Sequence, residues 1–497
     1  MRMDSHSINA KGSLMIQGTT SDAGKSICVA GLARVLKRRG FSVAPFKPQN
    51  MALNSAVTSC GGEIGRAQAL QAVACGIELT TDLNPVLLKP TNDMQSQVII
   101  QGKAVSQLDA KTFGNIKSLA FDKVLESYER LQKQYDVILI EGAGSPAEVN
   151  LRKNDIANMG FAEAVDCPVV LISDIDRGGV FAHLTGTVNL LSPSEQERIK
   201  GFIINKFRGR IELLQNGLDW LDEYTDKTIF GVVPYIKSLR LDAEDTINIE
   251  KDDTNSSINV KVPVLPRISN HTDFEPLKWH DKVNLEYVGA DSSLDNADLI
   301  ILPGTKNVRD DLNYIKQTGW DKQIKRHLRY GGKLLAICGG FQMLGNTISD
   351  PQGIESSAGE SKGLGLLDFS TRLEESKQLK NVSGEILFNQ NQMSISGYEI
   401  HCGTSTGAAL ENAFCQLTDQ SGQSHLDGAV SEDKLIIGTY VHGLFEDKAS
   451  MQTILHWVSG KQLAAQSWNE TREHELNRLA DCYEEHLDIE ALIAEVN

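Results

Sequence analysis

Short apolar segments alternate with segments of helical spacing along two long stretches of the chain. In the first stretch, residues 13–236, the almost wholly apolar segments are 14–16, 137–140, 169–172 and 202–204. Apolar residues recur at helical intervals between them, as in 27–38 and 116–133. Strands that are apolar on both sides must be covered on both faces. This alternation therefore predicts a parallel sheet between two layers of helices.

The same alternation starts again at residue 258 and predicts a second domain of the same class. Its apolar segments are 258–264, 285–288, 299–302 and 334–338, and the alternation ends near Val441. We therefore expect an α/β protein with two domains, each built on a doubly wound parallel sheet.

These patterns predict three boundaries. Residues 1–242 form the first domain and residues 258–460 the second. Residues 243–257 are acidic, polar and poor in core residues, which is typical of a linker. Residues 461–497 have apolar positions at helical spacing, and we expect this helical tail to pack on the second domain.

Composition and charge narrow the functional class. The 497 residues are 41% hydrophobic and 23% charged, as in soluble globular proteins, and no apolar run approaches the roughly 20 residues that cross a membrane. No secretory segment is visible, and the eight irregularly spaced cysteines include no Cys-x-x-Cys pair, so we expect a cytoplasmic protein without a disulfide framework. A net charge of −16 argues against nucleic acid as a main partner. No membrane partner is expected, and the oligomeric state stays open.

A glycine-rich loop follows the first predicted strand. Residues 18–26 read Gly-Thr-Thr-Ser-Asp-Ala-Gly-Lys-Ser, a P-loop pattern with one extra residue between its glycines. In such a loop, backbone N–H groups and the next helix N-terminus hold phosphate oxygens, Lys25 neutralises their charge and Ser26 binds magnesium. We therefore predict an ATP and Mg²⁺ site that includes Thr19, Asp22 and Gly24.

Two polar residues end later strands of the first domain. Glu141 follows the segment 137–140, where a second magnesium ligand or a water-orienting carboxylate belongs; otherwise it is a solvated loop acid. Asn205 ends the segment 202–204 and either binds the adenine edge of the nucleotide or closes a turn.

Two polar loops are expected at the same edge of that sheet. One contains Asn50 and Asn54, and the other contains Asp174 and Asp176. Ligands bind at this edge of doubly wound sheets, so these four residues are candidate substrate contacts. Ordinary turn chemistry is the alternative for both loops.

The clearest chemistry in the second domain is at Cys338. An apolar strand ends at this cysteine, and Gly339, Gly340 and a helix-like segment follow at once. Such a turn lies at a helix N-terminus, which activates a thiol, and its glycines leave room for a substrate carbonyl. We therefore predict that Cys338 is a nucleophile rather than a buried structural cysteine. His442, at the end of another strand, is the preferred base, and His401 ranks second.

These motifs resemble known families. The N-terminal half is similar to the P-loop fold of the dethiobiotin synthetase type, and the C-terminal half is similar to class I glutamine amidotransferases, whose domain is flavodoxin-like. Residues 338–342 match the nucleophile turn of those amidotransferases, and residues 302–306 match the loop that helps to form their oxyanion hole. From residue 13 to about 456, the chain resembles the cobyric acid synthase family, with its most specific motifs at 48–55, 174–181, 397–401 and 440–445.

The resemblance implies a reaction and roles for the motifs. It implies amidation of carboxylates b, d, e and g of adenosylcobyrinic acid a,c-diamide, with glutamine as the nitrogen donor and ATP with Mg²⁺ for activation. Backbone N–H groups near Gly304 and Gly339 would hold the oxyanion. Class I glutaminases usually have a glutamate two residues after the histidine, where this chain has Leu444, a difference that the cobyric acid synthase family shares. What orients His442 stays open, although Glu446 is within range.

Three other functions remain as alternatives. A cobyrinic acid a,c-diamide synthase would usually have an acid at the position of Asn50, and a CTP-synthase-like amidoligase would have the missing glutamate after His442. A P-loop ATPase switch with a non-catalytic second domain would not need Cys338 on a Gly-Gly turn.

Overall fold

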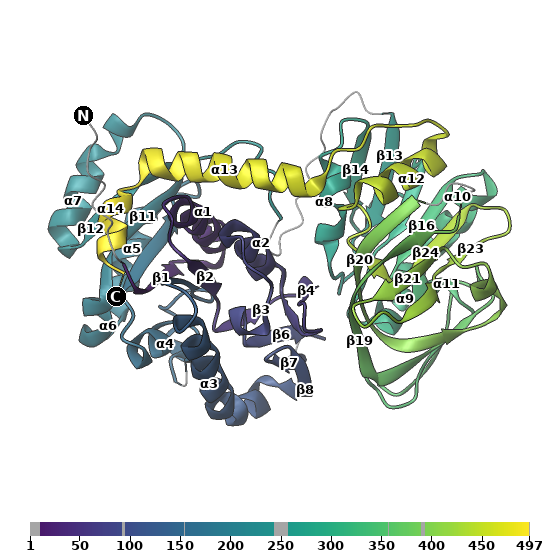
Figure 1. Ribbon diagram of the computed structural model, residues 1–497, viewed down its shortest axis with the longest axis horizontal. Helices are drawn as coiled ribbons and strands as arrows, with labels where there is room; N and C mark the ends of the chain where they lie inside the picture. The colour runs from purple at the N-terminus through teal and green to yellow at the C-terminus, as the bar shows by residue number, and fades with distance from the viewer. Residues whose placement is uncertain are drawn as a thin grey trace.

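The computed structural model describes residues 10–91, 95–153, 155–242, 257–355, 357–388 and 393–496. Almost all of the predicted linker, residues 243–256, lies outside these ranges. Two α/β domains lie side by side, and a long C-terminal helix crosses from one to the other (Figure 1).

The N-terminal domain is built on a six-stranded sheet in the order β12-β11-β10-β1-β9-β2, with every neighbouring pair parallel. Its strands are β1 (Gly12–Gly18), β2 (Val43–Phe46), β9 (Val137–Glu141), β10 (Val169–Asp174), β11 (Ile199–Phe207) and β12 (Thr228–Pro234). Its helices are α1 (Lys25–Arg38), α2 (Arg66–Cys75), α3 (Ala110–Gln132), α4 (Met159–Ala164), α5 (Val180–Leu190), α6 (Pro193–Arg198) and α7 (Gln215–Thr225). The predicted parallel sheet is confirmed.

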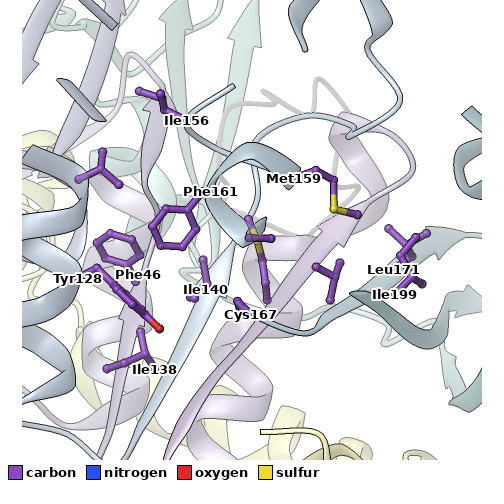
Figure 2. Packing of buried hydrophobic residues seen from close by; sticks show 14 of the residues in the cluster. Phe46, Tyr128, Ile138, Ile140, Ile156, Met159, Phe161, Cys167, Leu171 and Ile199 are labelled. Atoms are coloured by element: carbon purple, nitrogen blue, oxygen red, sulfur yellow. The ribbon is translucent and has the colours of Figure 1, made fainter. Parts of the chain in front are cut away.

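Buried apolar side chains cover both faces of this sheet. On one face Phe46, Tyr128 and Phe161, from β2, α3 and α4, pack with ring centroids 5.4–5.7 Å apart, within the cluster shown in Figure 2. On the other face, α1 contributes the largest share of a second cluster. Burial on both sides explains why these strands are almost wholly apolar in sequence.

Between β2 and α3, the chain forms small strands that the apolar pattern did not predict. They are β3 (Gln49–Met51), β4 (Ser55–Val57), β5 (Glu63–Gly65), β6 (Val86–Pro90), β7 (Gln95–Ile100) and β8 (Lys103–Asp109). β3, β6, β7 and β8 form one sheet, and β4 and β5 form a hairpin. The hairpin lies on the side that faces the C-terminal domain (Figure 1).

The main sheet of the C-terminal domain has the order β14-β13-β15-β16-β24-β23. Its strands are β13 (Ile258–Pro263), β14 (Val283–Val288), β15 (Leu299–Leu302), β16 (Lys333–Ile337), β23 (Ala429–Val430) and β24 (Ile436–Thr439). The five parallel strands follow the order 2-1-3-4-5 of a flavodoxin-like sheet, and only β23 is antiparallel. Its helices are α8 (Glu275–Lys278), α9 (Val308–Gln317), α10 (Trp320–Arg329), α11 (Gly339–Leu344) and α12 (Lys448–Ser459).

A second, mainly antiparallel sheet was not predicted; its strands lie between β16 and β24 in the sequence, except for β25, which follows β24. Its strands are β17 (Thr347–Asp350), β18 (Gly359–Lys362), β19 (Ser370–Ile386), β20 (Met393–Thr406), β21 (Cys415–Asp419), β22 (Ser424–Asp427) and β25 (Val441–His442). β25 pairs with β20, with Tyr398 opposite His442, so this sheet helps to place the predicted base.

The helical tail packs on the N-terminal domain, so the expectation that it packs on the second domain was wrong. It consists of α13 (Trp468–His486) and α14 (Ile489–Ala494), and α13 runs along α1 (Figure 1). Leu479 and Tyr483 are buried against α1, where Gly31 leaves room for the tyrosine ring. Helical spacing shows that a stripe is buried, but not which domain covers it. Within the described ranges, none of the helices has the length and apolar character needed to span a membrane.

Candidate active sites

Cys338 lies on a strained turn between β16 and α11. Its φ is +54° and its ψ −113°, a conformation that a non-glycine residue rarely adopts and that is characteristic of nucleophile turns. The next two residues are Gly339 and Gly340. Neither position has room for a side chain, because α11 packs closely on the loop after β15. A side chain at Gly340 would clash with the Leu302 carbonyl, and one at Gly339 would lie 3.1 Å from the Thr305 nitrogen. The Cys338 thiol is buried and donates to the Ile400 carbonyl at 3.4 Å.

His442 is held by a carboxylate. Its Nδ1 lies 2.6 Å from Oδ2 of Asp273, and Oδ1 of Asp273 also accepts the Gly443 N–H at 3.1 Å. The Tyr398 ring stacks on the imidazole with centroids 5.3 Å apart. These contacts fix both the position of the ring and the nitrogen that faces away from Asp273.

The remaining nitrogen of His442 is available for the thiol. Nε2 is buried and has no hydrogen-bond partner among the described residues. Burial lowers the pKa of His442, but its interactions with Asp273 and Cys338 raise it by more, to about 10. Gly304 lies against the same ring, since a Cβ there would be 3.1 Å from Cε1. Cys338, Gly339, Gly304 and His442 therefore lie in one site, as their predicted roles require.

Two other predicted partners of this site have different contacts. Glu446 does not orient His442; its carboxylate contacts Arg66 and lies 2.9 Å from Arg472. His401 stacks on Tyr440 at 3.8 Å, and burial lowers its pKa to about 4, which keeps the ring neutral. The geometry thus favours His442 over His401 as the base.

Asp273 was not found from the sequence. It lies in a polar run, residues 269–273, that follows β13 at the carboxyl edge of the main sheet. Cys338 follows β16 at the same edge. Polar residues after a strand at this edge were the available signal, because ligand-binding side chains collect there.

Lys25 and Ser26 lie where β1 passes into α1, the position expected for a P-loop. The Lys25 ammonium donates to the carbonyls of Thr20 and Ser21, at 3.0 and 3.1 Å, and so lies over the loop. Gly24 has a φ of +99°, which lets the loop turn into the helix. A loop of this kind at the N-terminus of a helix presents backbone N–H groups that bind phosphate oxygens.

Glu141 is the centre of a buried polar cluster beside the P-loop. Its Oε1 accepts from the Ser26 hydroxyl and the Lys47 ammonium, both at 2.7 Å, and its Oε2 accepts from Gln71 at 2.6 Å. A hydroxyl and a carboxylate so close together form the kind of oxygen pair that binds Mg²⁺ beside a nucleotide. Ser26 and Glu141 therefore fit a magnesium ion, with Lys47 sharing the same carboxylate oxygen.

The other predicted nucleotide contacts lie on the β10 side of the loop, opposite Glu141 of β9. The Thr19 hydroxyl lies 2.8 Å from that of Ser173. The Asn205 amide donates to the Ala23 carbonyl at 2.9 Å and lies against Gly24, so it supports the loop directly. Asp22 is half exposed and pairs with Arg177 at 3.1 Å.

The four predicted substrate residues fall into two separate groups. Asp174 pairs with Lys206 at 2.8 Å and Asp176 with Arg208 at 2.7 Å, both beside the P-loop after β10 and β11. Asn50 and Asn54 lie on the other side, after β2.

Asn50 and Asn54 connect to different neighbours. The Asn50 amide donates to Gln68 at 3.1 Å, and Gln68 in turn donates to Glu141 at 3.4 Å. The Asn54 amide nitrogen lies 2.9 Å from His271 of the C-terminal domain. Asn50 thus joins the P-loop cluster, whereas Asn54 joins the two domains.

Comparison with known proteins gives the same division of the chain. Residues 14–249 match the family of CobQ/CobB/MinD/ParA nucleotide binding domains, and residues 259–450 match that of CobB/CobQ-like glutamine amidotransferase domains. The prediction of a nucleotide-binding domain followed by an amidotransferase domain is confirmed.

Relatives match over almost the full chain. A cobyric acid synthase of Vibrio vulnificus strain CMCP6 is 56% identical over 96% of this chain and 98% of its own. Those of Vibrio parahaemolyticus and Vibrio campbellii are 56% and 54% identical, over 97% and 96% of this chain and 98% and 100% of their own. At this identity and coverage, the chain belongs to the cobyric acid synthase family.

Proposed function

We propose that this enzyme amidates carboxylates b, d, e and g of adenosylcobyrinic acid a,c-diamide in cobalamin biosynthesis, with glutamine as the nitrogen source and ATP as the activating nucleotide. The observation that carries the proposal is the constellation of Cys338, His442 and Asp273, in a chain whose other domain has a P-loop. All eight cysteines are free, which fits the proposed cytoplasmic location.

In the C-terminal domain, Cys338 is the proposed nucleophile. His442 takes the thiol proton, the thiolate attacks the glutamine carboxamide, and N–H groups near Gly304 and Gly339 bind the oxyanion. His442 then returns its proton to the leaving ammonia, and water hydrolyses the thioester to glutamate. Asp273 keeps the imidazole in the tautomer and orientation that these proton transfers need.

In the N-terminal domain, the proposed reaction activates a carboxylate. A carboxylate oxygen of the corrinoid attacks the γ-phosphorus of ATP, ADP leaves, and ammonia then displaces phosphate from the acyl phosphate to give the amide. Lys25 and the loop N–H groups hold the phosphates. Mg²⁺, held by Ser26 and Glu141, would supply further charge neutralisation at the phosphates. Asn50, Asn54, Asp174 and Asp176 are the proposed corrinoid contacts, on the two flanks of the P-loop.

The test uses adenosylcobyrinic acid a,c-diamide with the wild type and Cys338→Ala. We expect the wild type to add four amides, read by mass, with either glutamine or free ammonia, and to release one ADP for each. Cys338→Ala should add them only from ammonia. If glutamine supports both proteins equally, the glutaminase assignment is wrong. If the wild type hydrolyses glutamine but leaves this corrinoid unchanged, the substrate is wrong.

A further inference from the structure

A buried polar cavity lies beside Cys338 and is formed by both domains. Its lining comes from the loop after β15, from α11, from β19 and β20, and from β6 of the N-terminal domain. It contains four charged residues: Lys89, Lys306, Lys377 and Glu355. A glutamine whose carboxamide reaches Cys338 would place its charged α-groups within this cavity.

Two of the four charges are already paired. Lys89 and Lys377 bind opposite oxygens of Glu63, at 2.7 and 2.5 Å, so one carboxylate bridges two lysines from different domains. Lys89 also donates to the Ser55 hydroxyl at 2.9 Å. Both ammonium groups are therefore already paired with protein groups in the wall of the cavity.

Lys306 has no such partner. Its side chain is only 7% exposed, and in the described ranges its ammonium makes no hydrogen bond or ion pair. Its backbone is fixed, because its N–H donates to the Arg267 carbonyl at 2.9 Å. An anionic ligand group in the cavity would pair with this ammonium without displacing a protein partner.

Glu355 is the complementary group. It is also 7% exposed, and its Oε2 accepts the Val308 N–H at 3.0 Å. Burial raises the pKa of Glu355 to about 7, and the charge of Lys306 opposes the shift, as expected for a carboxyl near that ammonium. Within the described ranges the two side chains form no ion pair with each other, so each can serve a ligand.

We propose that Lys306 binds the α-carboxylate of glutamine and that Glu355 binds its α-ammonium group. This assignment rests on the proposed glutaminase function and identifies the residues that select its substrate. Lys306 lies two residues after Gly304, so one loop holds the oxyanion at one end of glutamine and the carboxylate at the other. Lys306 and Glu355 would thus bind glutamine in preference to a simple amide, which lacks both charged groups.

The test measures binding to the full-length Cys338→Ala chain by calorimetry. The ligands are L-glutamine, glutaramate, which lacks the α-ammonium, and 4-aminobutanamide, which lacks the α-carboxylate. Lys306→Met should lower the affinity for glutamine and glutaramate by about 10- to 100-fold and change the affinity for 4-aminobutanamide by less than about threefold. Glu355→Gln should lower the affinity for glutamine and 4-aminobutanamide but not that for glutaramate. Lys325→Met, at an exposed position on α10, is the matched control and should change none of the three.

Each outcome decides the assignment. The assignment is wrong if Lys306→Met weakens the binding of all three ligands equally, because that would show a structural role. It is also wrong if Lys306→Met leaves the affinity for glutamine unchanged. If the analogues bind too weakly to measure, the affinity for glutamine alone decides. With Cys338 intact, both variants should keep ammonia-dependent amidation, which shows that they fold. Failure of the wild type to amidate the corrinoid would refute the proposed function, but not a charge-specific glutamine site.

Discussion

At the scale of single residues, a carboxylate 169 positions away in the sequence orients the proposed base. The Asp273–His442 contact is 2.6 Å long and fully buried, and Asp273 also holds the backbone after the histidine. An acid from the segment after β13 thus takes the place of the usual glutamate after the histidine. The proposed triad is complete although the local sequence motif is absent.

We therefore expect Asp273→Asn to reduce glutamine-dependent amidation by about 10²- to 10⁴-fold, because the asparagine removes the charge that raises the pKa of His442 and favours the wrong tautomer. Ammonia-dependent amidation should be within a few fold of the wild type, because it bypasses Cys338. The measurement is the rate of amide formation with each nitrogen source. A parallel fall in both rates would point instead to a folding defect.

The raised pKa of His442 also predicts a pH dependence of stability. The folded pKa is about 10, against 6.5 for the ordinary group. Because the folded chain binds this proton more tightly, the stabilisation is complete below pH 6.5 and is lost as pH rises toward 10. The difference in unfolding free energy between wild type and His442→Gln should therefore be larger at pH 6.5 than at pH 9.5, as measured by urea titration. An equal difference at both pH values would contradict this.

The site was only partly predictable from its residues. Cys338 and Lys25 stand in compact local motifs, where the strand, the glycines and the helix follow within a few positions. Asp273 and Glu355 are far from those motifs, and only the folded sheets bring them to the cysteine or its cavity. Local sequence therefore indicates the proposed nucleophile, whereas the groups proposed to orient it and its substrate come together only through tertiary contacts.

At the scale of secondary-structure elements, α1 joins the P-loop to the C-terminal tail. Its first turn holds Lys25 and Ser26, and its apolar side packs against α13. The parallel strands were predictable because both of their faces are buried. β3 to β8 and the antiparallel sheet were not, because their strands are short or alternate with polar residues and lack the continuous apolar run.

The packing of α13 on α1 gives a stability prediction. Leu479→Ala should lower the free energy of unfolding by about 3 kcal/mol, because the side chain is fully buried between the two helices. Glu485→Ala, at an exposed position on the same helix, should change it by less than about 0.5 kcal/mol. Denaturant titrations of both variants provide the comparison. Similar small effects would show that the tail is not part of the folded N-terminal domain.

The Glu141 cluster gives a prediction for the P-loop. Glu141→Gln should abolish amidation from both glutamine and ammonia while leaving the reaction of Cys338 with an alkylating glutamine analogue unchanged. It should also destabilise the chain by about 3 kcal/mol, because the buried Lys47 loses its carboxylate. The control Glu126→Gln removes one partner of an exposed pair and should have almost no effect. Full amidation activity in Glu141→Gln would refute the proposed role in metal binding.

At the scale of the whole molecule, the two domains meet along a polar interface. Asn54 contacts His271, the Ser55 N–H donates to Asn270 at 2.9 Å, and Glu63 bridges Lys89 and Lys377. Asn270, Lys89 and Lys377 also line the cavity beside Cys338. The N-terminal domain therefore closes one side of the proposed glutaminase pocket.

A second cluster fixes the tail to the same interface. Arg472 of α13 binds both Asp242 and Glu446, at 3.2 and 2.9 Å, and Glu446 also contacts Arg66 of α2. Burial alone would disfavour the Glu446 carboxylate, but the two arginines lower its pKa to about 2. The tail, the N-terminal domain and the segment after His442 thus share one buried charge network, which holds the domains in a fixed relative position.

Glu63→Gln tests whether this fixed position matters for the transfer of nitrogen between the sites. The variant leaves two buried lysines without their shared carboxylate and should lose about 3–5 kcal/mol of stability. We expect it to hydrolyse glutamine still, but to form clearly less than one amide for each glutamate released, because the loosened interface lets ammonia escape. Asp295→Asn, which breaks an exposed ion pair with Arg326, is the control and should keep the ratio near one. Glutamate would be measured by enzymatic assay and amides by mass. A ratio near one in Glu63→Gln, despite lower stability, would mean that this interface supports the fold without guiding ammonia.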